Sequence, residues 1–147
     1  MAYTDRELFA RLIQCEAEGE GDDGMRAVAS VVMNRTTVPY GEFFRLLHGD
    51  VRKAIYQINQ FTCCKEVVAD AYNPQNIYNM TPQQIHYDIA DWALAGNTLG
   101  AVANSLWYYN PFSPKCSTFF PPGGTGIILT RINQHCFYIP TEKYAKT

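Results

Sequence analysis

The feature that most constrains the fold is a pair of helical patterns that follow one another almost without a gap. The first, over residues 5–17, places three apolar residues and Glu16 on one helix face, because they are spaced i, i+3, i+4 and i+7. The apolar three are Phe9, Leu12 and Ile13. The second pattern, over residues 24–35, is small or apolar nearly all round, which is typical of a central helix packed on several sides. A carboxylate on the buried face of the first helix needs a structural or chemical reason.

Capping signals set the expected ends of these two helices. Thr4 and Glu7 form a capping box, in which the Thr4 hydroxyl accepts from the Glu7 amide and the Glu7 side chain reaches back. The glycines within residues 19–21 are expected to end the first helix. An aspartate, either Asp22 or Asp23, is expected to cap the second.

The rest of the chain adds shorter elements and ends in strand patterns. The order Thr81-Pro82-Gln83-Gln84 predicts a helix N-terminus, with the helix ending near Ala95. A hairpin turn is predicted at Asn133-Gln134, and a Pro/Gly-rich loop over residues 110–126. The other predicted helices are 42–48, 50–57 and 65–72, and the predicted strands are 103–109, 127–132 and 135–139. We therefore expect a helix-dominated α+β fold with a small antiparallel sheet near the C-terminus, as a single domain over residues 1–147.

Charge and hydropathy narrow the classes of function. Only 18 % of the residues are charged, the formal net charge is −2, and the chain has no basic block. Binding to nucleic acid or to an anionic membrane through general electrostatics is therefore not expected. The N-terminus, MAYTDRELFA, lacks the charged and apolar regions of a signal peptide, and no apolar run reaches the roughly 18 residues of a membrane span.

The five cysteines leave several roles open. No CxxC occurs, so neither a zinc ribbon nor a redox motif is predicted, and most of the cysteines are expected to be buried thiols. A Cys116–Cys136 disulfide is an alternative that the sequence does not settle. His135 and Cys136 are strand neighbours that point to opposite faces and make a poor dyad, whereas His135 with Cys15 or Cys63 stays geometrically open. The histidines lack HExxH spacing, so no metal site and no cofactor are expected.

Glu16 is the first candidate for catalysis. Burial among apolar residues disfavours its charged form and should raise its pKa, which suits a general acid near neutral pH. The alternative is a partly exposed carboxylate at a helix end. Hydrolytic glycosidases usually use a second carboxylate; Glu20 lies four residues on, although capping or solvation is its simpler role. Without a second carboxylate, Glu16 could protonate the glycosidic oxygen and then act as a base on a sugar hydroxyl that closes an anhydro ring.

Aromatic residues near the C-terminus fit the binding of sugar rings. In a strand, alternation sends Tyr108 and Tyr109 to opposite faces, so one belongs to the core and the other can line a groove. We predict a groove with Glu16 at its floor and the Pro/Gly-rich loop at its border. Its wall is expected to come from Tyr108 or Tyr109, together with His135 or Tyr138.

The stretch LIQCEAEGEGDDGMRAVASVVMNR, residues 12–35, resembles the opening motif of the SleB/CwlJ cell wall hydrolases, the bacterial spore cortex-lytic family. Weaker matches follow in the family's order, at Gln60-Phe61, SLWYYNP (105–111), Cys116 and HCFY (135–138). Together they span nearly the whole chain, and the short length without a separate peptidoglycan-binding domain looks more like the CwlJ branch. The chain departs from the family pattern at residues 117–126, where STFFPPGGTG is unusually Pro/Gly-rich.

The resemblance implies that Glu16, in the family's EAxGE motif, is the catalytic acid. It also implies a lysozyme-like, lytic transglycosylase-like domain that cleaves spore cortex peptidoglycan carrying muramic lactam during germination. A spore-coat protein partner, and a place in the coat or cortex region after synthesis in the mother-cell cytoplasm, are associated with the CwlJ branch. The residues predicted to bind substrate are Glu20, Gln60, Phe61, Tyr108, Tyr109, His135 and Tyr138.

Two rival functions stay open. One is a cysteine peptidase, or an N-acetylmuramoyl-L-alanine amidase, that cuts the peptide stem, although the sequence offers no zinc ligands for an amidase. The other is a non-catalytic peptidoglycan-binding module, in which Glu16 is only a polar cap.

Overall fold

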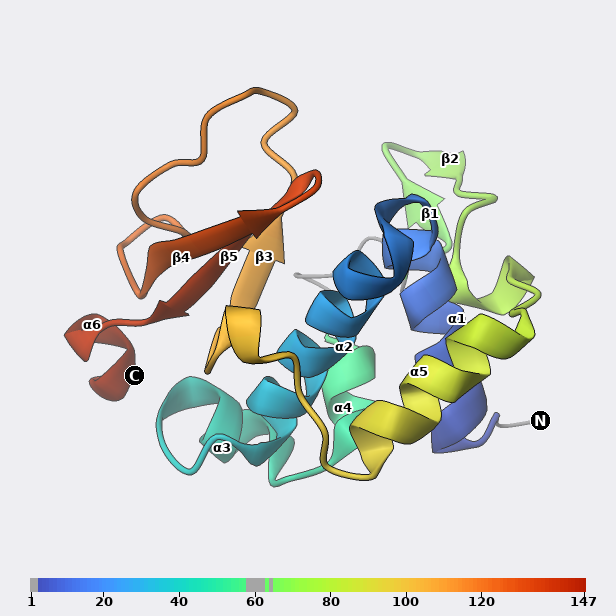
Figure 1. Cartoon of the computed structure of the whole chain (residues 1–147), viewed down its shortest axis with the longest axis horizontal. Coiled ribbons are helices and arrows are strands. Elements are labelled where there is room, and N and C mark those ends of the chain that lie inside the picture. The colour runs from blue at the N-terminus through green and yellow to red at the C-terminus, as the bar shows by residue number, and fades with distance from the viewer. Residues whose placement is uncertain (1–2, 58–62, 64) are drawn as a thin grey trace.

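Residues 3–57, 63 and 65–147 are described by the computed structural model, in which a group of helices adjoins a small sheet (Figure 1). The α-helices are α1 (Asp5–Ala17), α2 (Gly21–Thr37), α3 (Gly41–Leu47), α4 (Val51–Ile55), α5 (Gln84–Leu94) and α6 (Glu142–Ala145). The 3-10 helices are η1 (Glu18–Glu20), η3 (Ile77–Asn79) and η4 (Gly100–Val102). The strands are β1 (Val67–Val68), β2 (Ala71–Tyr72), β3 (Trp107–Tyr109), β4 (Gly126–Ile132) and β5 (His135–Pro140).

Helix α2 lies at the centre of the molecule, as its nearly continuous apolar surface predicted. It contacts α1, α3, α4 and α5 on the helical side and β3 and β4 on the side of the sheet. In Figure 1 it runs between α1 and α5 on one side and the sheet on the other. Small residues such as Ala27, Ala29 and Ser30 are fully buried along it, and they let neighbouring elements approach closely. The helix therefore fixes where α1 lies relative to β3.

The C-terminal sheet is antiparallel, with the strand order β3-β5-β4. Strands β4 and β5 form a hairpin whose pairing ends at Ile132↔His135, so the turn falls at Asn133 and Gln134 as predicted. In β3, Tyr108 lies opposite Phe137. A short β3 replaces the longer strand predicted from residue 103, because Ala103 has a positive φ and follows a 3-10 turn. The helix-rich α+β fold with a small antiparallel sheet is confirmed.

The largest error concerns residues 65–72, which were predicted as a helix and form the β1–β2 hairpin instead. Ala69 and Asp70 both have positive φ, and their turn joins two strands in which Val67 pairs with Tyr72. Branched and aromatic side chains favour this extended pairing over a short helix. In Figure 1 the hairpin stands beside the C-terminal end of α1.

Two of the predicted caps are also wrong, and one is confirmed. The Thr4 hydroxyl accepts from the Glu7 amide at 3.1 Å and caps α1 as predicted. The other half of the capping box is wrong, because the Glu7 carboxylate accepts from Arg11 and Tyr87. No aspartate side chain caps α2, because the 3-10 turn η1 leads directly into it and its N-cap is Glu20. Helix α5 begins later than expected, after Gln83, whose backbone amide donates to the His86 ring at 2.9 Å. Within the described residues, none of the helices has the length and apolar character that a membrane span requires.

Candidate active site

Glu16 lies in the last turn of α1, on the helix face that packs into the protein. Residues before it on this face, Phe9, Leu12 and Ile13, are fully buried, whereas Glu16 itself is half-buried. The helix ends one residue later and continues into η1. The local sequence thus holds the glutamate at the edge of the core, with one side of its carboxylate toward protein and the other toward a pocket.

Tyr108 provides the hydrogen bond on the protein side. Its hydroxyl donates to Glu16 Oε1 at 2.7 Å, although the two residues are far apart in sequence. The ring of Tyr108 is buried between His135, with ring centroids 4.9 Å apart, and Phe137, at 5.9 Å. Strand pairing between β3 and β5 sets these contacts, so the sheet fixes the hydroxyl that meets the glutamate.

Arg35 places a buried positive charge near the same carboxylate. Its guanidinium, fully buried in α2, donates to the carbonyl of Leu106 and, at 3.0 Å, to Gln57 Oε1. Burial lowers the pKa of Arg35 to about 10, which leaves the side chain charged at neutral pH. Its charge favours the ionised form of Glu16.

The pKa of Glu16 is raised above its ordinary value, and burial is the dominant cause. The hydrogen bond from Tyr108 and the charge of Arg35 act in the opposite direction, because each stabilises the carboxylate. A glutamate in this balance keeps a proton at higher pH than a solvated one. It is therefore suited to donate that proton to a leaving oxygen and later to accept one.

The other side of the carboxylate borders a pocket of about 290 Å³. Its lining residues are Cys15, Glu16, Cys63, Val68, Asn73 and Gln75. Asn73 fixes the base of the β1–β2 hairpin, since its side-chain amide donates to the carbonyls of Lys65 and Gln75, both at 3.1 Å. Sequence reasoning missed this wall because residues 65–72 were predicted as a helix. The Val67-Val68 pair and Tyr72, on either side of Asp70, were the available hairpin signal.

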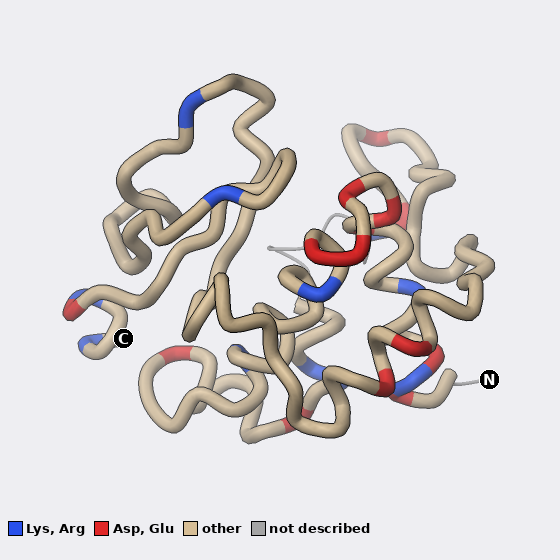
Figure 2. Tube along the Cα trace, in the orientation of Figure 1, with Lys and Arg blue, Asp and Glu red and all other residues tan. Residues whose placement is uncertain are grey.

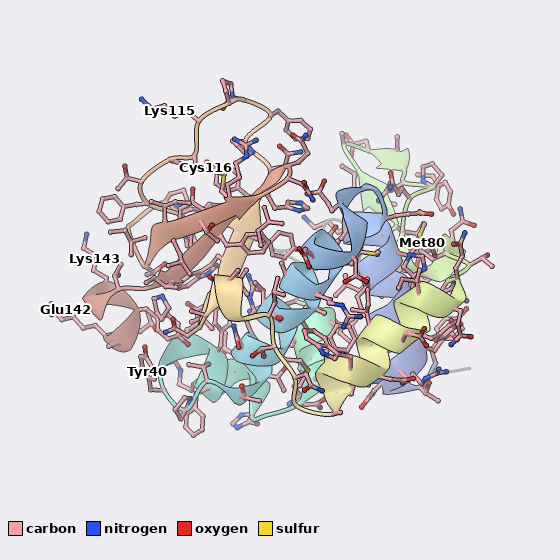
Figure 3. The ribbon with its side chains drawn as sticks, viewed as in Figure 1. Tyr40, Met80, Lys115, Cys116, Glu142 and Lys143 are labelled. Carbon is pink, nitrogen blue, oxygen red and sulfur yellow. A yellow bond between two sulfur atoms is a disulfide. The ribbon has the colours of Figure 1, made fainter. Side chains whose placement is uncertain are left out.

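Four of the five cysteines form disulfides, so the prediction that most cysteines are buried thiols is wrong. Cys116 is bonded to Cys136, the pairing that the sequence left open, and Figure 3 shows Cys116 on the loop next to the sheet. Cys15 is bonded to Cys63, a pair that was not predicted. Cys63 Sγ lies 2.8 Å from Glu16 Oε2. Because a disulfide sulfur carries no hydrogen, this approach is a close non-bonded contact and not a hydrogen bond.

Glu20 and His135 hold the β4–β5 turn against the junction of α1 and α2. His135 Nδ1 lies 3.0 Å from Glu20 Oε1, which also accepts from the backbone amide of Gln134 at 3.0 Å. The Asn133 side chain donates to the Glu20 carbonyl, and a Cβ at Gly24 would lie 2.4 Å from Glu20 Cβ, so only glycine permits this approach. Burial lowers the pKa of His135, and Glu20 opposes this shift in part. Both side chains are thus engaged within the protein.

Tyr109 and Tyr138 lie on the opposite face of the sheet, away from Tyr108. Tyr109 stacks on Phe120 with ring centroids 4.4 Å apart, and its hydroxyl bonds the Ser117 hydroxyl. The Tyr138 hydroxyl donates to the Ser117 carbonyl at 2.7 Å, and burial raises the pKa of Tyr138 to about 12. Both tyrosines therefore anchor the Pro/Gly-rich loop. Among the predicted substrate-binding residues, Gln60 and Phe61 lie outside the described residues, and substrate binding by the others stays a prediction.

Acidic residues gather at the junction of α1 and α2 (Figure 2). Those in the first turns of η1 and α2 are Glu18, Glu20, Asp22 and Asp23. In the part of the chain that the structure describes, no group of three His, Cys, Asp or Glu side chains is placed to hold a metal ion.

Comparison with known proteins identifies the family to which this chain belongs. The model of the Cell Wall Hydrolase family matches residues 19–138, a stretch that begins just after Glu16. Cell wall hydrolase CwlJ of Bacillus subtilis is 30 % identical over 140 residues, which cover 95 % of this chain and 88 % of that protein. Cell wall hydrolase CwlJ of Oceanobacillus iheyensis is 27 % identical over 92 % of this chain and 86 % of its own length.

Two solved structures have a fold similar to that of this chain. The catalytic domain of the germination-specific lytic transglycosylase SleB from Bacillus anthracis superposes with a TM-score of 0.64 at 25 % identity, covering 94 % of this chain and 96 % of that domain. The catalytic domain of SleB from Bacillus cereus gives a TM-score of 0.56 at 22 % identity, over 93 % of this chain and 92 % of that domain. The fold is thus that of SleB catalytic domains, which are lysozyme-like.

Proposed function

This chain belongs to the cell wall hydrolase family, and we propose that it cleaves the glycan strands of peptidoglycan with Glu16 as its general acid. The observation that carries the proposal is the environment of this one carboxylate. It has a raised pKa, a hydroxyl donor at 2.7 Å and an adjacent pocket of about 290 Å³. Those are the properties that protonation of a glycosidic oxygen requires.

The proposed reaction is that of a lytic transglycosylase. Glu16 donates its proton to the glycosidic oxygen as the bond between that oxygen and the anomeric carbon breaks. The resulting carboxylate then removes the proton from a hydroxyl of the same sugar, whose oxygen attacks the anomeric carbon and closes an anhydro ring. The proton returns to Glu16, so that one glutamate acts as acid and then as base and no water is consumed.

The engagement of Glu20 favours this route over hydrolysis with two carboxylates. Its Oε1 faces His135 and the Gln134 amide, both at 3.0 Å, and the side chain is buried. A carboxylate used in this way stabilises the β4–β5 turn and is poorly placed to activate a water. The name of the SleB structure, a lytic transglycosylase, supports the same reading.

Among the described residues, the cysteines that a cysteine peptidase could use as nucleophiles are all in disulfides. Cys15 and Cys63 are joined to each other, and Cys136 is joined to Cys116, so none of these sulfurs is a thiolate beside His135. Cys64 lies outside the described residues. A non-catalytic module would have no need for a raised-pKa carboxylate at a pocket, and the experiment below separates it from an enzyme.

We further propose that the substrate is spore cortex peptidoglycan with muramic lactam, and that the chain acts during germination as one catalytic domain over residues 1–147. The support is the similarity to proteins named CwlJ and to a germination-specific SleB. A place in the coat or cortex region and a spore-coat protein partner belong to the same proposal.

Mass spectrometry of muropeptides released from intact cortex tests the reaction. We expect products that end in anhydromuramic acid, each one water lighter than a reducing end, and at least a ~100-fold slower release with Glu16→Gln. Glu18→Gln, in an exposed glutamate of the same junction, is the matched control and should release products normally.

Other products would overturn parts of the proposal. Reducing ends, with an equal loss in Glu20→Gln, would indicate a two-carboxylate hydrolase. New free amines would indicate cleavage of the peptide stem. Binding of cortex without any released product would indicate a binding module.

A further inference from the structure

The carboxylate of Glu16 is contacted on both of its oxygens. The Tyr108 hydroxyl lies 2.7 Å from Oε1, and Cys63 Sγ lies 2.8 Å from Oε2. Cys63 is bonded to Cys15, the residue directly before Glu16. One disulfide thus joins the backbone that carries the glutamate to a sulfur that touches its carboxylate.

We propose that the Cys15–Cys63 disulfide positions the Glu16 carboxylate, and that its reduction to two thiols slows glycan cleavage. The proposal rests on the function proposed above for Glu16. It assigns to the disulfide a role at the site in addition to stabilising the fold, because both sulfurs belong to residues that line the Glu16 pocket.

Space around the two sulfurs is the first reason. Cys15 and Cys63 are both buried, and two thiol sulfurs that are no longer bonded must move apart to van der Waals distance. Cys63 Sγ can move little toward Glu16, which is already at 2.8 Å. Cys15 Sγ is 3.3 Å from the carbonyl of Gln75, which also lines the pocket. Reduction therefore displaces either the carboxylate or the pocket wall.

The hydrogen gained by the thiol is the second reason. A disulfide sulfur offers nothing to Oε2, whereas the Cys63 thiol could donate to it and stabilise the ionised carboxylate. Tyr108 on β3 and Arg35 on α2 already act in that direction against burial. A third group acting the same way lowers the pKa of Glu16, so that less of the enzyme holds the proton that the leaving oxygen needs.

The redox step is a thiol–disulfide exchange with a dithiol such as dithiothreitol. The dithiol supplies two electrons and two protons, the sulfur–sulfur bond breaks, and Cys15 and Cys63 each gain one hydrogen. The dithiol is oxidised to its own disulfide. No metal or further co-reactant is needed.

The test compares the oxidised and the reduced protein, with Cys64 replaced by serine throughout so that this cysteine cannot exchange with either disulfide. Differential alkylation followed by mass spectrometry reports which bonds are open. Because a displacement of about 1 Å at a reacting group can cost ~100-fold in rate, we expect reduction of Cys15–Cys63 to slow muropeptide release at least ~5-fold. The Cys15→Ala/Cys63→Ala variant should not respond to the reductant, whereas Cys116→Ala/Cys136→Ala should respond as the unmodified protein does.

A second readout does not depend on activity. NMR titration of isotope-labelled glutamate, with Glu16 assigned through Glu16→Gln, should show a lower pKa of Glu16 in the reduced protein than in the oxidised one. An unchanged rate and an unchanged pKa, with both thiols shown to be free, would overturn the proposal. An equal response to reductant in Cys15→Ala/Cys63→Ala would also overturn it. If the oxidised protein released no product, the proposed function would fail. The NMR titration would still decide, without any activity measurement, whether the disulfide positions the Glu16 carboxylate.

Discussion

Tyr108 and Tyr109 are identical, adjacent residues of β3 with different surroundings. Tyr108 points to the helices and donates to Glu16 at 2.7 Å. Tyr109 points to the other face of the sheet, stacks on Phe120 and bonds Ser117. Alternation along one strand thus assigns one tyrosine to the candidate catalytic carboxylate and the other to a loop.

The difference shows that the sheet has two separate roles. Its helix-facing side carries Tyr108, His135 and Phe137, whose rings contact one another. Its other side carries Tyr109 and Tyr138, which hold the Pro/Gly-rich loop. Substitutions on the two faces should therefore separate activity from stability.

Tyr138→Ala should have the largest effect, which is a loss of stability. The ring is fully buried and its hydroxyl bonds the Ser117 carbonyl, so truncation should cost about 3–5 kcal/mol in the free energy of unfolding. Denaturant unfolding measures this cost. Phe112→Ala, at a residue that is 88 % exposed, is the control and should cost no more than about 0.5 kcal/mol. A defect in activity without loss of stability in Tyr138→Ala would contradict the separation of the two faces.

Tyr108→Phe should have the next largest effect, which is a loss of activity. The ring and its packing remain, but Glu16 Oε1 loses its donor, and mispositioning of the acid should reduce the rate of glycan cleavage by about 10- to 100-fold. Loss of one hydrogen bond should change the free energy of unfolding by only about 0.5–1.5 kcal/mol. Tyr109→Phe is the matched control on the other face. Equal rates for the two variants would show that the hydroxyl of Tyr108 has no part in catalysis.

Glu20→Ala should have a moderate effect on stability. It removes the acceptor of the part-buried Gln134 amide and the partner of His135, and the loss of both interactions should cost about 1–3 kcal/mol. Thermal unfolding measures the loss. Unchanged stability, together with a rate as low as that of Glu16→Gln, would instead place Glu20 in the reaction.

Among the effects on stability, that of Glu16→Gln should be the smallest, and it should be a gain that depends on pH. The pKa of Glu16 is higher in the folded than in the unfolded protein, so its protonated form is favoured by folding. Protonated Glu16 therefore contributes to the stability of the fold at pH values below its pKa in the unfolded protein. This contribution is lost as the pH rises through its pKa in the folded protein. Glu16→Gln should therefore melt at a higher temperature than the unmodified protein. The difference should be larger at pH values above the pKa of Glu16 in the folded protein than at pH values below its pKa in the unfolded protein. A gain that is independent of pH would contradict the raised pKa.

Local signals explain what could be predicted from the sequence. The bounds of α1 were predicted correctly because a capping residue and a helical period both lie within residues 4–17. The β4–β5 hairpin was predicted from alternation and its turn residues. The position of Glu16 on a buried face followed from the same period.

The remaining features depend on contacts between distant residues. The Cys15–Cys63 bond joins residues 48 positions apart, and no spacing rule selects it among the pairs that five cysteines allow. Alternation separated Tyr108 from Tyr109, but only the position of α2 decides which of them faces Glu16. The β1–β2 wall of the pocket was missed because its strands are two residues long, too short for a period to show.

The pH dependence of muropeptide release tests the central claim, that Glu16 is a general acid held by the helix-facing side of the sheet. The unmodified protein should lose activity at high pH with an apparent pKa above the ordinary value of a glutamate, because burial dominates. Tyr108→Phe removes a hydrogen bond that lowers this pKa, so the alkaline limb should move to higher pH, while Tyr109→Phe should leave it in place. An alkaline limb that stays fixed in Tyr108→Phe, or that moves equally in both variants, would contradict the claim.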